Sequence, residues 1–241
     1  MIGTRLHLFR AIVGGLAWAC MAVAASAAQR SSSTVDRFLA RTDPAPAQHR
    51  ALRHLEAQNQ HFGASAWMDV WTEADPVGGF RYMVVAEGGS GYIRRRVFLA
   101  ALDAEQRMWR NGEPMRAELN LTNYVIEDRG ITNGFASLSM MPRRKDVLLF
   151  DGAVYITPED GDLVWLEGRL SKNPSIWTRR VEVMRRYGRV AGIRVPVEIT
   201  SEAHVFIAGR STFRMTYEYE TINGQRVGNP QVRTPSRKEY R

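Results

Sequence analysis

The chain has 241 residues, a formal net charge of +8 and a single cysteine, Cys20. One cysteine excludes an internal disulfide, so the stability of the fold must come from a buried apolar core. The chain is long enough to build one such core in a single domain.

Residues 1–28 have the three parts of a secretory signal. Arg5 and Arg10 give a positive start, residues 11–25 form an uncharged and mostly apolar run, and small residues follow where a signal peptidase cleaves. The run is short for a membrane-spanning helix, although a retained membrane anchor is the alternative. We therefore predict export to the periplasm, where nucleic acid is not an expected partner.

The first half of the mature chain is predicted to combine helices with one hairpin. Residues 29–46 form a polar lead-in, and apolar residues on one stripe then predict a helix over residues 47–60. Residues 65–74 and 79–88 are predicted strands, because the turn between them is rich in proline and glycine. Over residues 92–112 the apolar residues again recur at helical spacing, which predicts a second helix.

The chain changes character from Tyr124 onward, where pairs such as Asn-Gly and Asp-Gly recur at short intervals. Between these turns, residues 193–200 and 213–220 alternate apolar and polar side chains. A period of two with one wet face is what an antiparallel sheet requires, and we predict about eight strands here. Pro196 has no amide hydrogen to donate, so its strand should lie at an edge or be bulged there.

Residues 179–199 carry six arginines among apolar residues, which raises the question of a nucleic-acid-binding patch. Val181, Val183 and Tyr187 fall on one face of a strand, while most of the arginines fall on the other. This spacing predicts the solvent side of a strand and excludes a helix that enters a groove. Arg185 breaks the pattern by sharing the face of the valines, which places it at a rim.

No set of residues assembles into a catalytic or metal site in the sequence. The loop at residues 87–92 resembles a nucleophile elbow around Ser90 but lacks its second glycine, so a hydrolase is a weak alternative. His54 and His61 are two helical turns apart, too far for one metal ion, and the acidic turn at residues 159–162 lacks the positions of a calcium loop. We predict no enzymatic activity, no cofactor and no bound metal.

Large apolar and aromatic side chains are abundant along the alternating strands. Core packing is the simplest interpretation, but a strongly curved antiparallel sheet covered by helices commonly encloses more volume than its side chains fill. Such a fold would hold an apolar ligand pocket. The predicted ligand-binding wall residues are Trp67, Trp71, Leu138, Met140, Trp165, Phe213, Met215 and Tyr217.

The segment "MPRRKDVLLFDGAVYITPEDGDLVWLEGRL", residues 141–170, resembles the bacterial outer-membrane lipoprotein-sorting (LolA/LolB-like) superfamily. In that superfamily a stretch of proline and basic residues leads into a strand, a glycine turn, a second strand and an apolar-Glu-Gly segment. The resemblance covers residues 124–224 well and the first half loosely. It implies an α+β fold over residues 47–224, a curved, half-open antiparallel β-barrel covered by two or three helices, which shelters acyl chains.

The predicted function is a periplasmic, non-enzymatic carrier that holds lipid or lipoprotein acyl chains in an apolar barrel cavity, with envelope or membrane proteins as further partners. The superfamily also includes stress sensors, so the alternative is an envelope interaction or stress-sensing module with a filled core and no ligand. Residues 225–241 follow the domain as a basic tail with few large apolar residues, and we predict that this tail is disordered.

Overall fold

In a computed structural model of the chain, residues 33–228 are described, apart from positions 42, 44, 112–116, 174–177 and 207–208. The predicted signal, the start of the polar lead-in and the end of the basic tail lie outside the described residues. Everything described belongs to one compact unit.

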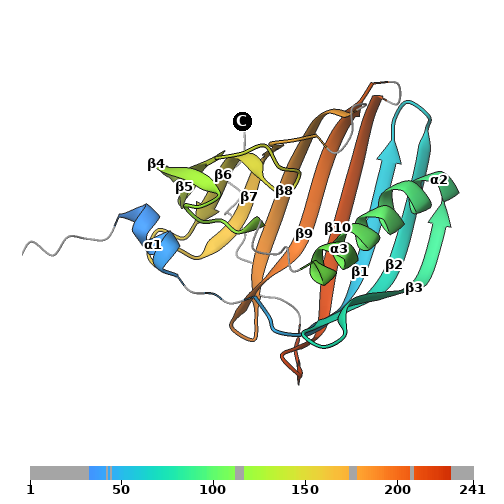
Figure 1. Cartoon of the computed structure of the whole chain (residues 1–241), viewed down its shortest axis with the longest axis horizontal. Coiled ribbons are helices and arrows are strands. Elements are labelled where there is room, and N and C mark those ends of the chain that lie inside the picture. The colour runs from blue at the N-terminus through green and yellow to red at the C-terminus, as the bar shows by residue number, and fades with distance from the viewer. Residues whose placement is uncertain are drawn as a thin grey trace, which may run out of the picture. The chain divides into compact units, whose positions relative to one another are not determined.

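Eleven strands of the described chain form one antiparallel sheet (Figure 1). The strands are β1 (His49–Asn59), β2 (Ala64–Asp75), β3 (Gly79–Gly89), β4 (Tyr124–Thr132), β5 (Phe135–Pro142), β6 (Phe150–Ile156), β7 (Leu163–Leu170), β8 (Thr178–Val190), β9 (Ile193–Val205), β10 (Gly209–Ile222) and β11 (Gln225–Arg226). Their order is β3-β2-β1-β10-β9-β8-β7-β6-β5-β4, with β11 paired to β10. The strands β3 and β4 are therefore the two edges, and the sheet is open.

Two groups of helices lie at the two ends of this sheet (Figure 1). The first helix, α1 (Thr34–Ala40), contacts β4. The second group is continuous and consists of α2 (Gly91–Ile93), the π-helix η1 (Arg94–Leu99) and α3 (Ala100–Arg110), which packs on β3. The predicted α+β class and the antiparallel sheet covered by helices are thus confirmed, while closure around an apolar barrel cavity stays a prediction.

The predicted helix over residues 47–60 is wrong, because this segment is strand β1. Ala51, Leu55 and Ala57 are buried on one face, and the residues between them are more exposed. The strand pairs along its whole length with β2 on one side and β10 on the other. Pairing on both edges with burial of one face outweighs a local pattern that also fits a helix.

The other predicted elements of the domain are confirmed in the described residues. The hairpin is β2–β3, residues 92–112 are helical as far as Arg110, and the chain from Tyr124 contains eight strands. Pro196 lies in β9, an interior strand, and the register with β8 shifts beside it, as the predicted bulge requires. The irregularity therefore removes the need for an amide hydrogen at this position.

Two separate apolar clusters lie on the helix face of the sheet, the face on which the helices pack. We name them after their helices. The α3 cluster contains Ala51, Leu55, Ala57, Ala66, Met68, Val70, Ala74, Phe80, Ile93, Phe98, Leu102, Val190, Val195, Met215, Tyr217, Tyr219 and Ile222. The α1 cluster contains Phe38, Tyr124, Ala136, Leu138, Met140, Leu149, Phe150, Val154, Ile156, Leu163 and Leu166. The region between these clusters, at β8 and β9, positions the candidate site.

Candidate functional site

One row of directly opposed residues crosses the sheet from β5 to β2 on the helix face. Opposed residues of antiparallel strands point to the same face. In strand order the row contains Leu138, Val154, Leu166, Arg185, Ile199, Met215, Leu55 and Met68. Arg185 is its one charged member and its one exposed member, and Ile199 beside it is partly exposed. The apolar floor of the helix face is therefore interrupted by a guanidinium at β8.

Arg185 lies in a hollow of the fold and not at the outer rim that the sequence predicted. Water reaches its side chain, yet the surrounding protein also desolvates it. Interaction with Tyr187, followed by Tyr217, raises the pKa of Arg185 despite this desolvation. Tyr187 also shares a hydrogen bond with it, and Glu105 on α3 adds a weaker attraction. A group that is both wet and closely surrounded lines a concave surface.

A second arginine on the same face is neutralised. Arg53 on β1 is only 2% exposed and places its Nη1 and Nη2 at 2.6 and 3.0 Å from the two carboxylate oxygens of Glu105. Its guanidinium lies over the rings of Phe80 and Tyr217, at 5.1 and 4.8 Å from their centroids. This bidentate pair takes up the charge of Glu105, because no oxygen of that carboxylate is left without an arginine partner.

His49 reports the positive charge of this region. Burial, and then the positive charge of Arg53, lowers the pKa of His49 to about 4, so its ring is neutral at pH 7. The ring packs edge-on against Tyr219, whose hydroxyl donates to the carbonyl of Pro196 at 2.9 Å. Burial also raises the pKa of Tyr217, so its hydroxyl is a neutral hydrogen-bonding group.

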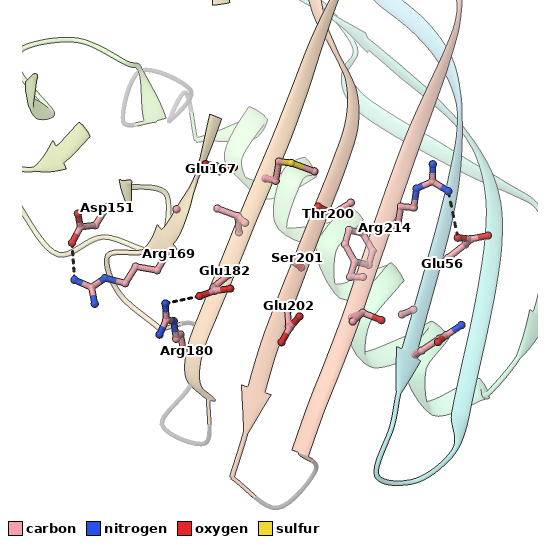
Figure 2. Close-up of a pocket in the computed structure, with 17 residues that line it drawn as sticks. Glu56, Asp151, Glu167, Arg169, Arg180, Glu182, Thr200, Ser201, Glu202 and Arg214 are labelled. Atoms are coloured by element: carbon pink, nitrogen blue, oxygen red, sulfur yellow. Dashed lines mark hydrogen bonds and ion pairs between the residues drawn. The ribbon is translucent and has the colours of Figure 1, made fainter. Parts of the chain in front are cut away.

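The opposite, helix-free face of the sheet has a different chemistry (Figure 2). A concavity of about 900 Å³ there is lined mostly by charged and hydroxyl side chains. Figure 2 shows that its charges are paired: Arg169 with Asp151 at 2.8 Å, Arg180 with Glu182 at 2.5 Å, and Arg214 with Glu56 at 4.0 Å. These lining residues lie on β1, β6, β7, β8 and β10. The concavity offers matched charges and no apolar slot.

The eight predicted wall residues are divided between the two faces. Five of them lie on the helix face, where Leu138 and Met140 belong to the α1 cluster and Phe213, Met215 and Tyr217 line or contact the α3 cluster. The three tryptophans lie on the helix-free face. A two-residue period shows which side chains share a face within one strand, but it does not show which face the helices cover. The eight residues therefore do not line one hollow.

The three tryptophans make specific contacts on the helix-free face. Trp67 is 40% exposed and stacks on His54, with ring centroids 6.3 Å apart. Trp71 lies under the guanidinium of Arg50, 4.5 Å from the ring centroid. Trp165 is the third, and its ring stacks on that of Tyr155 at 4.2 Å. These contacts are those of surface aromatic ladders across neighbouring strands.

Sequence reasoning missed Arg185 and Glu105 as site residues, although Arg185 gave a signal by breaking the alternation of its strand. The Ser90 loop is structural, because the Ser90 hydroxyl caps α2 by accepting from the amide of Ile93. The acidic turn at residues 159–162 is a turn, as predicted. It holds the buried Asp162, which accepts two hydrogen bonds of 2.7 Å from Arg189.

Comparison with known proteins adds little to this geometry. No family model and no curated protein matches the chain. Among solved structures, the complex of Pseudomonas aeruginosa MucA/MucB matches with a TM-score of 0.23 and 10% identity, over 83% of this chain and 98% of that one. A TM-score of this size supports no conclusion on fold or function. Within the described residues, no helix has the length and apolar character needed to span a bilayer.

Proposed function

We propose that the protein is a non-enzymatic periplasmic binding protein for molecules with long acyl chains, which lie on the helix face between the α1 and α3 clusters. The observation that carries the proposal is the pair of half-buried apolar borders at the interruption. Val183 and Tyr187 pack against the α1 cluster, and Ile199 and Phe213 pack against the α3 cluster, and all four remain partly exposed.

The energetics favour an acyl chain at such a border. Each methylene group that leaves water contributes about 0.8 kcal/mol, so a chain needs no polar contact along its length to bind usefully. The same border would otherwise leave apolar surface in water on both sides of Arg185. A flexible chain that covers both borders would join the two clusters into one continuous apolar layer.

Neighbouring residues on β8 provide a matched test. Val183 and Met184 are both partly exposed, but they point to opposite faces of the sheet. Titration with Nile red, a neutral lipophilic dye, should show saturable binding to the wild-type protein that Val183→Gln weakens several-fold and Met184→Gln leaves unchanged. Lipid recovered by organic extraction of protein from the native envelope would add the natural ligand. Absence of saturable dye binding to the wild type would refute the proposal.

The concavity of the helix-free face favours a second candidate function, an envelope interaction module. Its lining of paired charges and hydroxyl groups suits a polar polypeptide surface better than a lipid. In that case the protein takes up no dye, and site-specific cross-links to an envelope protein formed in the cell should disappear in the double variant Arg180→Glu, Arg214→Glu. Cross-links that persist in this variant would count against the helix-free face as the interaction surface.

A further inference from the structure

The position of Arg185 defines the chemistry of one end of the ligand. We infer that Arg185, together with the hydroxyl groups of Tyr187 and Tyr217, binds the anionic head group of the acyl ligand, a carboxylate or a phosphate. This inference rests on the proposed function, because the acyl chain would occupy the apolar borders on either side. It assigns a charge to the ligand, which the apolar borders alone do not.

The charge balance of the helix face supports an anionic group. Two guanidinium groups, those of Arg53 and Arg185, face one carboxylate, that of Glu105. Glu105 gives both of its oxygens to Arg53. In the described part of the chain, no carboxylate forms an ion pair with Arg185. The region therefore retains one uncompensated positive charge, next to a neutral His49 and neutral tyrosines.

The groups that face Arg185 from the neighbouring strands leave it available to a ligand. Its opposed neighbours are Leu166 on β7 and Ile199 on β9, neither of which has a polar side chain. Arg185 itself is exposed to water, so its donors are accessible. A guanidinium presents five N–H donors in a planar fork that matches a carboxylate or a phosphate with two parallel hydrogen bonds. An arginine in this place is suited to recognition of such a group.

Contrast with the helix-free face excludes a general role of these arginines in solubility. Arg180, Arg186 and Arg214 on that face each lie within ion-pair distance of a carboxylate, Glu182 or Glu198. Their charges are balanced without any ligand. Arg185 lies next to Arg186 in the chain but on the other face, so the two arginines form a matched pair of the same residue type with and without a carboxylate partner.

The experiment compares ligands that differ only in their head group. Displacement of Nile red by dodecanoate, dodecyl phosphate and dodecanol measures the contribution of the anionic group at constant chain length. We expect the wild-type protein to bind at least one of the two anions about 10–100-fold more tightly than the alcohol, since hydrogen bonds to charged groups are the stronger class. Arg185→Met should abolish this preference without weakening dodecanol, and Arg186→Met should retain it.

The outcomes separate the inference from the proposed function. Equal affinity of the wild type for all three ligands, or a preference that survives in Arg185→Met, overturns the head-group assignment while acyl binding stands. Failure of all three ligands to displace the dye overturns both. Inorganic phosphate that displaces the dye as well as dodecyl phosphate would show a free-anion site and also overturn the assignment. The unfolding midpoint of Arg185→Met checks folding, and we expect no decrease because methionine suits the apolar row.

Discussion

The α3 cluster and the α1 cluster lie on the same face of one sheet but are held together by different means. In the α3 cluster a buried ion pair, Arg53–Glu105, fixes the long helix over the strands. In the α1 cluster no such pair is present among the described residues, and two strands instead approach closely at Gly152 and Gly168. One end of the sheet is thus specified by electrostatics and the other by steric fit.

The difference explains why the apolar layer stops between the clusters. A helix fixed to β1 by an ion pair covers the strands near it, and the short α1 covers the strands at the other edge. Neither helix reaches the middle of the row at Arg185, which remains wet. A sheet that is continuous in its hydrogen bonds can therefore carry two cores and an open site between them.

The largest effect is expected when the ion pair of the α3 cluster is broken. Glu105→Gln leaves the guanidinium of Arg53 buried without its charged partner, and such changes cost about 3–5 kcal/mol of unfolding free energy. Urea denaturation followed by tryptophan fluorescence measures this loss.

A double variant provides the control for this ion pair. Replacing both partners, Arg53→Met with Glu105→Leu, removes the unpaired charge and should recover most of the lost stability. If Glu105→Gln were as stable as the wild type, the helix would be held by apolar contacts alone, and the electrostatic half of the comparison would be wrong.

The next effect concerns the close approach in the α1 cluster. A Cβ atom at position 152 would lie 2.1 Å from the carbonyl oxygen of Glu167 and 2.5 Å from the Cα of Gly168. Because both neighbours are backbone atoms, β6 and β7 would have to separate, and Gly152→Ala should cost about 2–3 kcal/mol. Thermal unfolding measures it. Ala153→Gly, at the adjacent position on the other face, should cost about 1 kcal/mol or less, and equal losses would remove the steric argument.

The sequence predicted the strands of the second half well, because turn residues and a period of two are local properties. It failed at β1, where Ala51, Leu55 and Ala57 fit a helix as well as a strand and only pairing with β2 and β10 decides. It also could not assign faces. Trp67 and Tyr217 both alternate correctly, but the helices that cover one face and expose the other come from distant parts of the chain.

The site shows the same limit. The break in alternation at Arg185 is visible in the sequence, whereas its partner strands and the competition with Arg53 for Glu105 are not. Those relations depend on the register of five strands and on the position of α3. Charge balance in a fold is a property of three-dimensional neighbours, so the sequence alone predicted a rim where the structure has a hollow.

A pH effect of about 2 kcal/mol is expected in the α3 cluster. The folded-state pKa of His49, about 4, lies below its ordinary value of 6.5 because of burial and then Arg53. The unfolded chain therefore binds the proton first on acidification, and stability present above pH 6.5 is lost as the pH falls from about 6.5 to about 4. Urea denaturation at pH 7 and pH 4.5 measures the loss, which His49→Phe should reduce.

A second histidine on β1 is the natural control for this effect. Hydrogen bonding to Asp69, at 2.5 Å, raises the pKa of His54 on the helix-free face. Its contribution has the opposite sign, because it is fully present below pH 6.5 and is lost as the pH rises through the folded-state pKa. His54→Gln should therefore leave the loss between pH 6.5 and pH 4 intact. A wild-type protein equally stable at pH 7 and pH 4.5, with no change in His49→Phe, would argue against a buried neutral His49.

The smallest effect tests whether α1 belongs to the α1 cluster energetically. Ser33 caps this helix, its hydroxyl accepting from the amide of Asp36 at 3.1 Å while the Asp36 carboxylate accepts from the amide of Ser33 at 3.2 Å. Ser33→Ala should cost about 1 kcal/mol, and Ser33→Asp, which keeps an acceptor, should cost less. Because Phe38 is buried in the cluster, the loss should appear in global unfolding. Faster hydrogen exchange confined to α1, with unchanged global stability, would mean that β4–β7 hold their core without the helix.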